Sequence, residues 1–357
     1  MEYHYLAFIG RFQPFHLGHK HVLDEALAVS ECVLVLVGSA NVTRSPRNPF
    51  TFEERAQMLR DTYPYEVETG RLIIKPLDDV TYNDVAWTSD VQKLVAQTVL
   101  THANKGGEIL HGLTDFKIGL VGYGKDGSSY YLKMFPDWGN ISIKPRYGML
   151  SSTDIRADYF RGNAALPRDN CPDAVVRFLD AFRTTDVFAA LVEEIAFVAE
   201  YKAKWSTAPF DPVFVTVDAV VVQSGHVLLV RRGQQPGLGR LALPGGFVDP
   251  SEPLRQSVVR ELKEETQIAD AKGPIPPAML ASFIEDAQSR VFDDPYRSAR
   301  GRTITHAFLF RLPDRKRLFS VKGGDDAAHA QWYRLGELDP RDFFEDHWFI
   351  LQQMTGI

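Results

Sequence analysis

The sequence predicts an α/β chain in which a doubly wound parallel sheet is followed by a second, mixed α+β domain. Two observations predict the first domain: continuous apolar runs typical of buried strands, and stretches of helical periodicity that separate them. Strands that are apolar on both faces are typical of a parallel sheet covered by helices on each side. Beyond about residue 185, short strands cluster around one helix, which indicates the mixed domain.

The composition is that of a globular protein with about two domains. The chain has 357 residues, of which 45% are hydrophobic and 24% are charged, and roughly 150 residues make one domain. These values exclude a disordered chain, a collagen and a coiled coil. The net charge of −6 and the pI near 5.9 argue against a nucleic-acid or membrane-surface binder, because such proteins concentrate positive charge.

Cysteine usage and hydropathy indicate the compartment. Cys32 and Cys171 are too few for a disulfide framework or a cysteine metal site, and we expect both to be buried. No apolar run approaches the ~18 residues that span a bilayer, and residues 1–11 lack the pattern of a signal peptide. We therefore expect a cytoplasmic protein.

The first domain, residues 1–185, opens with a βαβ unit. Strands are predicted over residues 5–9, 32–37, 72–77, 117–122 and 141–144, and helices over residues 17–28, 51–62 and 85–102. Thr51 and Glu54 have the spacing of a capping box, which predicts that the second helix begins there.

A helix and linker, residues 186–209, lead to the second domain, residues 210–357. The helix is predicted over residues 187–205, and two prolines within residues 206–212 indicate irregular chain. Ser224 and Gly225 then form the turn of a hairpin whose strands are residues 213–222 and 226–231. A helix over residues 253–266 and strands over residues 281–285, 305–312 and 331–335 complete this domain.

The first candidate site is the segment GRFQPFHLGH, residues 10–19, which leaves the first strand and opens the first helix. Helix N-termini at the carboxyl ends of parallel strands favour anions, so we expect a phosphate site here. Gly10 and Gly18 permit close backbone approach. His16 and His19, three residues apart, can point to the same side and donate hydrogen bonds to phosphate oxygens.

A second segment, SSTDIR, supports this prediction. Ser151, Ser152 and Thr153 offer caps and hydroxyls at a helix start, and Arg156 lies in the first turn. Arg156 could neutralise the charge on a leaving pyrophosphate. Taken alone, this segment is better explained by plain helix capping.

Together the two segments resemble the nucleotidyltransferase superfamily with HxGH and ISSTxxR signatures, with Ser151 in place of the usual Ile. With Asn48-Pro49-Phe50-Thr51, Glu54 and Arg55, they look most like the archaeal-type nicotinamide mononucleotide (NMN) adenylyltransferases. The resemblance implies a Rossmann-like domain that binds ATP, NMN and Mg²⁺. It also implies that His16, His19 and Arg156 contact the ATP phosphates, that Trp87 stacks on nicotinamide, and that the substrates also touch Gly10, Arg11, Phe12, Gln13, Gly18, Ser151, Ser152 and Thr153.

Such a reaction needs no catalytic base. The attacking group would be the NMN phosphate, which is already anionic because its second pKa is about 6. Positioning and charge neutralisation therefore suffice.

The second candidate site is an acidic face on the helix predicted over residues 253–266. Glu261, Glu264 and Glu265 are three and four residues apart, so their carboxylates share that face and repel one another. A divalent cation would reverse the repulsion, and Mg²⁺ and Mn²⁺ prefer carboxylate oxygens. Arg260 can pair with Glu252 and hold it in place.

Residues 246–268 resemble the Nudix box, Gx5Ex7REUxEExGU, where U is apolar. The resemblance implies that Glu261, Glu264, Glu265 and the carbonyl of Gly246 bind Mg²⁺ or Mn²⁺, and that Glu252 and Arg260 support the site. Gln267 replaces the second glycine. It would adopt a left-handed C-cap there at a cost of about 1 kcal/mol.

An arginine-rich loop after the box resembles the ADP-ribose pyrophosphatase branch of this family. It implies that Arg297 and Arg302 bind ADP-ribose and that the products are AMP and ribose 5-phosphate. A separate base could be Glu285, Asp293 or Asp294, and the sequence does not choose among them.

Both motifs on one chain resemble the bacterial enzymes that join an NMN adenylyltransferase to a Nudix hydrolase. Two alternatives stay open: a second domain that senses ADP-ribose without cleaving it, and a first domain that uses another phosphorylated acceptor. The expected partners are small molecules, with no nucleic acid and no membrane. The sequence leaves the oligomeric state open, a homo-oligomer included.

Overall fold

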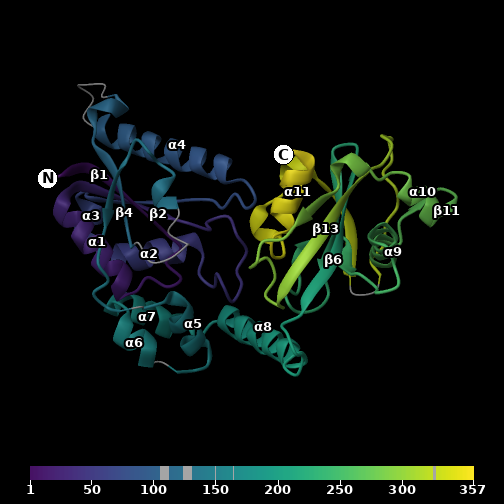
Figure 1. Ribbon diagram of the computed structural model, residues 1–357, viewed down its shortest axis with the longest axis horizontal. Coiled ribbons are helices and arrows are strands. Elements are labelled where there is room, and N and C mark those ends of the chain that lie inside the picture. Colours follow the sequence, from purple (N-terminus) through teal and green to yellow (C-terminus); the bar gives the residue numbers. More distant parts are fainter. Residues whose placement is uncertain (105–111, 124–130, 149, 164, 325–326) are drawn as a thin grey trace. The chain divides into compact units, whose positions relative to one another are not determined.

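The computed structural model divides the chain into two compact units, Met1–Val192 and Glu193–Ile357. It describes residues 1–104, 112–123, 131–148, 150–163, 165–324 and 327–357. The division lies within helix α8 (Asp186–Ala203), which Figure 1 labels. This helix falls in the segment that the sequence predicts as a helix and linker.

The first unit contains a five-stranded sheet in the order β3-β2-β1-β4-β5 with every pair parallel, as predicted. Its strands are β1 (Tyr3–Gly10), β2 (Ser30–Val37), β3 (Leu72–Pro76), β4 (Ile118–Gly122) and β5 (Gly139–Ser142). From β1 the chain adds β2 and then β3 on one side of the sheet. It then crosses to the other side of β1, where it adds β4 and then β5. The carboxyl ends of β1 and β4 therefore flank the switch point where such sheets bind ligands.

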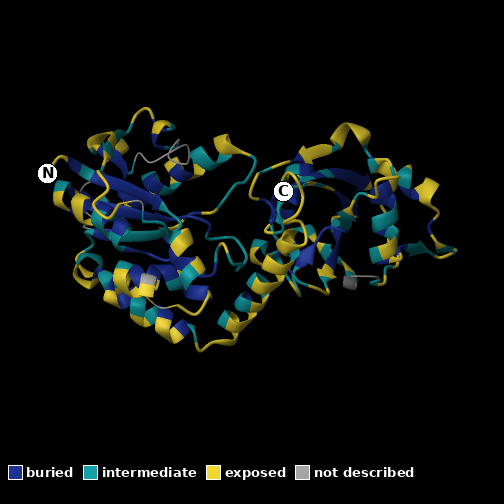
Figure 2. Cartoon of the chain, turned by 60° about the horizontal axis from the view of Figure 1, so that its bottom comes forward, coloured by how far each residue is buried: buried dark blue, intermediate teal, exposed yellow. Residues whose placement is uncertain are grey.

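Helices cover both faces of this sheet (Figure 1). On one face, Tyr5, Ala7 and Ile9 of β1 share a core with α4 (Asp84–Ala103), and on the other the Phe8 ring contacts His19 of α1 (Leu17–Val29). Figure 2 shows the resulting buried strands in dark blue. The remaining helices are α2 (Phe52–Thr62), α3 (Pro64–Glu68), α5 (Ser152–Phe160), α6 (Ala165–Asn170) and α7 (Asp173–Phe182), with a 3₁₀ turn, η2 (Leu113–Asp115).

Local signals in this unit behave as the sequence predicts. The side chains of Thr51 and Glu54 form the reciprocal capping box that starts α2. Cys32 and Cys171 are buried free thiols. None of the helices in the described part of the chain is long and apolar enough to cross a membrane.

The second unit is built on a mixed sheet in the order β12-β13-β6-β7-β14, in which β8 pairs with β7 and β9 with β6. Strands β6 and β13 are parallel and the other pairs are antiparallel, which confirms the mixed α+β prediction. The strands are β6 (Val213–Gln223), β7 (His226–Arg232), β8 (Leu241–Ala242), β9 (Gly245–Phe247), β12 (Arg290–Phe292), β13 (Arg302–Arg311) and β14 (Ala327–Arg334). A separate pair joins β10 (Ala269–Asp270) to β11 (Gly273–Pro274).

The hairpin and the helix of the second unit also form as predicted. Ser224 and Gly225 have φ of 48° and 74°, the positive values that a tight turn between β6 and β7 requires. Helix α9 (Leu254–Thr266) buries Val258 and Leu262 in the core under the sheet. Other helices are α10 (Pro277–Ala281) and α11 (His347–Thr355), with 3₁₀ turns η4 (Asp286–Gln288), η5 (Leu335–Glu337) and η6 (Pro340–Asp342).

The strand predicted over residues 281–285 is wrong. Helix α10 ends at Ala281, and Ile284 makes only an isolated bridge to Phe310. A short apolar run cannot be assigned to a strand or a helix by periodicity, and here Pro276 and Pro277 begin a helix instead.

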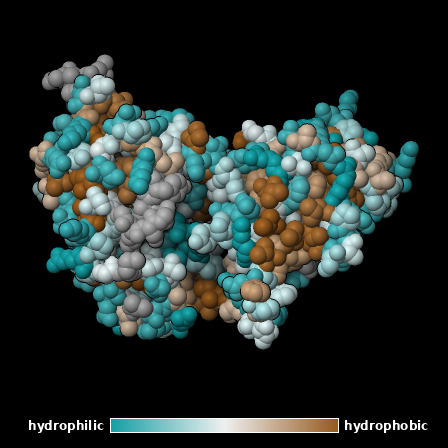
Figure 3. Space-filling view, viewed as in Figure 1, coloured by the Kyte–Doolittle hydropathy of each residue, from teal (hydrophilic) through white to brown (hydrophobic). Residues whose placement is uncertain are grey.

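One apolar face of the second sheet extends beyond the helix that covers it. Val213 and Val215 alternate with the buried Val217 on the same face of β6, yet they are 57% and 43% exposed. Val291 on β12 is also exposed. Figure 3 shows hydrophobic residues, in brown, gathered on this unit.

Candidate active sites

The segment that follows β1 is held in place by buried polar side chains. Gln13, which is 1% exposed, donates a hydrogen bond to the Phe50 carbonyl at 2.9 Å and accepts one from the Phe50 N–H at 3.0 Å. The Phe12 ring is also 1% exposed and folds against Gly10. These two buried side chains therefore shape the loop. Gln13 and Phe12 have only backbone atoms left with which to contact a ligand.

Arg55 ties this loop to the next one. Its buried guanidinium donates hydrogen bonds to the carbonyls of Arg11 at 2.7 Å, Gly38 at 2.6 Å and Ser39 at 3.0 Å. Burial lowers its pKa to about 10, so it stays charged at neutral pH. Arg55 thus fixes the backbone after β1 against the backbone after β2.

His16 and His19 form the N-terminus of α1. The Nδ1 atom of His16 accepts hydrogen bonds from the N–H groups of Gly18 at 3.1 Å and His19 at 3.3 Å, so a histidine serves as the N-cap. The two rings stack with centroids 3.7 Å apart, on the same side as predicted. A side chain at Gly18 would clash with the His16 ring, since its Cβ would lie 2.9 Å from Cε1.

The arginines near this helix start are crowded together. Arg156 is 8% exposed and donates hydrogen bonds to the Gln13 carbonyl at 2.6 Å and to Thr153 Oγ1 at 3.2 Å. Burial and the charges of Arg11 and Arg47 lower the pKa of Arg156 to about 10. Burial and Arg47 likewise lower the pKa of Arg11. An anion bound among these three guanidinium groups would relieve their repulsion.

The second segment joins the first through α5. Ser151 is the N-cap of α5, and its Oγ accepts the Thr153 N–H at 3.1 Å. Ser152 donates a hydrogen bond from Oγ to the Pro14 carbonyl at 3.3 Å. The two motifs therefore meet in space, which places the starts of α1 and α5 together at one edge of the sheet.

Trp87 lies in the first turn of α4, next to Tyr131, whose hydroxyl donates a hydrogen bond to the Ile9 carbonyl near the end of β1 at 3.4 Å. Its ring packs edge-on against Tyr131 at 6.3 Å and Phe135 at 6.4 Å, beside the core that α4 makes with the sheet. Its side chain is partly buried.

Two participants near this site are not singled out by the sequence. The charge of Arg47 lowers the pKa of Arg11 and of Arg156. Tyr123, just after β4, donates a hydrogen bond from its hydroxyl to the Gly18 carbonyl at 2.8 Å. Neither contact follows from a local pattern.

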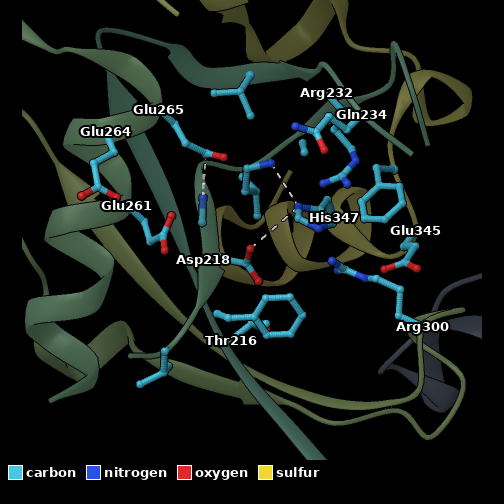
Figure 4. A pocket seen from close by; sticks show the side chains of 18 of the residues that line it. Thr216, Asp218, Arg232, Gln234, Glu261, Glu264, Glu265, Arg300, Glu345 and His347 are labelled. Atoms are coloured by element: carbon cyan, nitrogen blue, oxygen red, sulfur yellow. Dashed lines mark hydrogen bonds and ion pairs between the residues drawn. The ribbon is translucent and has the colours of Figure 1, made fainter. Parts of the chain in front are cut away.

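The second site is a cavity of about 620 Å³ in the second unit. The three glutamates of the predicted acidic face line it, as the spacing predicts. In Figure 4, Glu261, Glu264 and Glu265 lie on one side, Arg232, Gln234, Arg300 and Glu345 on the other, and Asp218 and His347 between them. The cavity thus has an acidic wall facing a largely basic one.

Arg260 holds the acidic wall together. It donates to Glu252 at 2.9 Å, as predicted, and shares Nη1 between Glu261 at 2.8 Å and Glu264 at 2.9 Å. Ser257 also donates to the Glu252 carboxylate, at 3.0 Å. Among the described residues, no group of three acidic, histidine or cysteine side chains is already positioned to hold a metal ion, and Arg260 joins three carboxylates of this wall.

Glu265 lies deepest in the acidic wall. Burial and the neighbouring Glu261 raise its pKa to about 8, although the Gly245 N–H donates to its carboxylate at 3.0 Å. A side chain at Gly246 would meet Glu261, with its Cβ 2.7 Å from Oε1. The backbone of β9 therefore runs directly against the Glu261 carboxylate.

A buried polar network underlies the cavity. Asp218 accepts a hydrogen bond from Thr305 at 2.6 Å and lies 3.9 Å from Arg297. Arg297 in turn makes two hydrogen bonds of 2.9 Å to Asp346. His347 accepts the Leu243 N–H at 3.0 Å, and burial lowers its pKa to about 3, so it is neutral.

Of the two arginines expected to bind ADP-ribose, only Arg297 lines the cavity. Its side chain, however, is only 4% exposed and forms an ion pair with Asp346. Arg302 does not line the cavity and pairs with Asp293 instead, because it already belongs to β13. Arg300 and Arg232, which were not singled out, supply the basic wall.

None of the three carboxylates considered as a base lines the cavity described here. Glu285 pairs with Arg311 at 2.8 Å, Asp293 pairs with Arg302, and Asp294 accepts the Tyr296 N–H at 2.8 Å.

Known protein families match both units. The cytidylyltransferase-like family matches residues 7–158, and the NUDIX domain family matches residues 212–354. A nicotinamide/nicotinic acid mononucleotide adenylyltransferase of Acinetobacter baylyi is 32% identical over 193 residues, 54% of this chain and 94% of that protein. An ADP-ribose pyrophosphatase of Methanocaldococcus jannaschii is 34% identical over 138 residues, 39% of this chain and 70% of that protein.

One solved structure matches both units at once. The crystal structure of a bifunctional NMN adenylyltransferase/ADP-ribose pyrophosphatase from Francisella tularensis is 35% identical, with a TM-score of 0.86 and coverage of 98% of both chains. The chain belongs to this bifunctional family. A second structure of the Francisella protein, complexed with AMP and a manganese ion, is 34% identical with a TM-score of 0.85 and the same coverage.

The departure of this chain from the Nudix box, at Gln267, has a clear structural form. Gln267 caps α9 with φ of 45° and ψ of 37°, the left-handed conformation expected at the missing glycine. Its N–H still bonds to the Lys263 carbonyl at 2.9 Å. The substitution therefore strains one residue locally and leaves Glu261, Glu264 and Glu265 on the cavity wall.

Proposed function

We propose that the first unit transfers the adenylyl group of ATP to NMN, giving NAD and pyrophosphate. The family membership supports this reaction, and so does the meeting of the HxGH and SSTxxR segments at the switch point of the sheet. An oxygen of the NMN phosphate bonds to the α-phosphorus of ATP. The bond from that phosphorus to the bridging oxygen breaks, and pyrophosphate leaves with the electron pair.

The residues of this site act by hydrogen bonding and charge. Because Nδ1 of His16 accepts backbone hydrogen bonds, its hydrogen is assigned to Nε2, which can donate to a phosphate oxygen. Arg11, Arg47 and Arg156 offset the charge that builds on the departing pyrophosphate. No side chain has to remove a proton, since the attacking phosphate is already anionic.

We propose that the second unit hydrolyses ADP-ribose to AMP and ribose 5-phosphate. The acidic wall fits a divalent cation, because Glu261 and Glu265 repel each other and a positive charge between carboxylates relieves such repulsion. Glu261, Glu264, Glu265 and the Gly246 carbonyl would hold Mg²⁺ or Mn²⁺, with Glu252 keeping Arg260 in place. Such an ion would polarise the diphosphate and lower the pKa of an attacking water.

The observation that supports both proposals is that this chain, in which the HxGH and SSTxxR segments meet and three glutamates line a cavity, aligns with a bifunctional relative over nearly its full length. The test is a pair of assays on the purified full chain. NMN, ATP and Mg²⁺ should yield NAD, and ADP-ribose with Mg²⁺ or Mn²⁺ should yield AMP. Failure of either assay refutes that half of the proposal.

The alternatives predict different results in the same assays. A sensor domain would bind ADP-ribose, leave it intact and change the rate of NAD formation, but the three carboxylates on the cavity wall disfavour it. A different acceptor would appear when NMN, nicotinic acid mononucleotide and pantetheine phosphate are compared. The name of the Acinetobacter relative makes nicotinic acid mononucleotide the first acceptor to compare.

A further inference from the structure

Aromatic side chains line the second cavity away from the residues of the Nudix box helix. Phe197 and Tyr201 come from α8, and Phe247 comes from β9. Phe197 and Phe247 are large apolar side chains, yet they are 37% and 38% exposed. Exposed aromatic faces inside a cavity indicate a surface that a ligand covers.

One face of α8 belongs to the cavity wall. Phe197 and Tyr201 are four residues apart and so share a face of the helix, and Glu194 precedes Phe197 by three residues on that face. Burial and the charge of Glu345 raise the pKa of Glu194 to about 7. Because Phe197 and Tyr201 both line the cavity, this face of α8 points into it.

Two of these rings, Tyr201 and Phe247, pack against one shared neighbour. Phe214 of β6 contacts Tyr201 with centroids 6.0 Å apart and Phe247 with centroids 5.7 Å apart, both edge to face. Arg300 places its guanidinium 5.1 Å from the centre of the Phe247 ring. This cluster is therefore preorganised, which lowers the cost of binding a ligand.

The chemistry of the cavity separates the parts of a nucleoside diphosphate. The carboxylate wall suits a cation and the diphosphate that it would bind, whereas flat apolar rings suit a nucleobase, which has a π face and stacks on aromatic side chains. A ribose ring offers hydroxyl groups and no such face. The aromatic side chains thus match the base and not the terminal sugar.

We propose that Phe197, Tyr201 and Phe247 form a stacking subsite for the nucleobase of the diphosphate substrate, with α8 supplying two of the three rings. This inference rests on the proposed hydrolase function and deepens it. It makes α8 part of the second active site in addition to the connection between the two units. It also makes Phe197 and Tyr201 determinants of substrate affinity that lie outside residues 246–268.

The test compares Phe197→Ala and Tyr201→Ala with the wild-type full chain. Stacking of one base accounts for roughly a 5- to 100-fold change in affinity. Each variant should raise KM for ADP-ribose and the inhibition constant of AMP by a factor in this range, with kcat changed by less than about threefold. The inhibition constant of ribose 5-phosphate should stay within about twofold of the wild-type value.

Trp205→Ala is the matched control, because Trp205 packs on the same Phe214 ring at 5.3 Å but does not line the cavity. It should leave the inhibition constant of AMP unchanged. Phe197→Trp, which keeps a flat ring, should retain AMP inhibition and guards against a folding defect in Phe197→Ala. The proposal is overturned if AMP inhibits the alanine variants as well as it inhibits the wild type, or if only ribose 5-phosphate inhibition weakens.

Calorimetric titration with AMP separates this inference from the proposed function. A wild-type chain that cleaves ADP-ribose while its AMP affinity is insensitive to Phe197→Ala would refute the subsite alone. A chain whose AMP affinity depends on Phe197, but which does not cleave ADP-ribose, would refute the hydrolase function and leave the subsite standing.

Discussion

His16 and His19 cap one another: the Nδ1 atom of each ring accepts the other residue's backbone N–H, at 3.3 Å and 3.4 Å, while the rings stack at 3.7 Å. One pair of side chains thus satisfies free N–H groups at the start of α1 and sets the orientation of both rings. The other nitrogen of each ring, Nε2, is the one assigned to donate to a phosphate. We therefore propose that helix capping and phosphate binding are combined in the same two residues.

This double role predicts that stability and activity can be separated at His16. His16→Ala should lower the free energy of unfolding by about 1 kcal/mol through loss of the cap, and NAD formation by about 100-fold or more through loss of the phosphate donor. His16→Asn restores a capping oxygen, so it should recover most of the stability but little of the transfer rate. Urea denaturation and an NAD assay give the two readouts.

ADP-ribose hydrolysis by the same variants is the internal control and should not change. Wild-type NAD formation by His16→Asn would contradict the assigned role of the ring.

The crowded arginines predict a specific effect on ATP. Arg47 lowers the pKa of Arg11 and of Arg156, so Arg47→Ala removes repulsion in the free protein and a cation from the phosphate site. The variant should be at least as stable as the wild type, while KM for ATP rises about tenfold. Arg60→Ala removes an exposed cation from α2 and should leave this KM unchanged. Equal effects of the two substitutions would mean that Arg47 acts only through overall charge.

The raised pKa of Glu265 predicts that the stability of the metal-free protein depends on pH. Its pKa is raised from 4.5 in the unfolded chain to about 8 in the folded chain. The folded state therefore holds a proton that the unfolded state releases, so stability is fully present below about pH 4.5 and is lost as the pH rises towards 8. Relative to Glu265→Gln, metal-free wild type should lose on the order of 3 kcal/mol between pH 5 and pH 8.

The comparison is made by urea unfolding in EDTA at several pH values. Adding Mg²⁺ should stabilise the wild type more at pH 8 than at pH 6, because at the lower pH the ion must displace a proton. Parallel profiles for the two proteins would show that Glu265 is ionised throughout.

The family resemblance implies that Arg297 binds substrate. Its buried contacts predict instead that replacing it lowers the stability of the protein. Its guanidinium is buried against Asp346, so Arg297→Ala leaves a buried carboxylate without its partner and should cost about 3–5 kcal/mol. Arg302→Ala breaks a more exposed pair with Asp293 and should cost less than about 1 kcal/mol. Thermal or urea unfolding checks both. If Arg297→Ala were as stable as the wild type and changed only KM, substrate binding would be its role.

Local patterns predict much of this molecule. The spacing of Glu261, Glu264 and Glu265 on one helix is enough to place them on one wall, and the missing glycine of the Nudix box predicts the left-handed Gln267. Capping at Thr51 follows in the same way. Each of these depends on residues within a few positions of one another.

Contacts between distant segments are what the sequence does not predict. Arg55 reaches the loops after β1 and β2, and Tyr123 reaches Gly18 from the far side of the switch point. Arg300 lines the cavity while Arg302, two residues later, does not, because a strand begins between them. The pattern of α8 predicts a helix, but it does not indicate that Phe197 and Tyr201 face a cavity.

We propose that this one chain carries two independent phosphate sites with separate chemistries. The most direct measurement is a parallel assay of NAD formation and ADP-ribose hydrolysis by the wild type, Arg156→Ala and Glu261→Gln. We predict that the wild type performs both reactions, that Arg156→Ala loses only the first, and that Glu261→Gln loses only the second. A wild type that lacks either reaction, or a single substitution that abolishes both in a folded protein, would contradict the account.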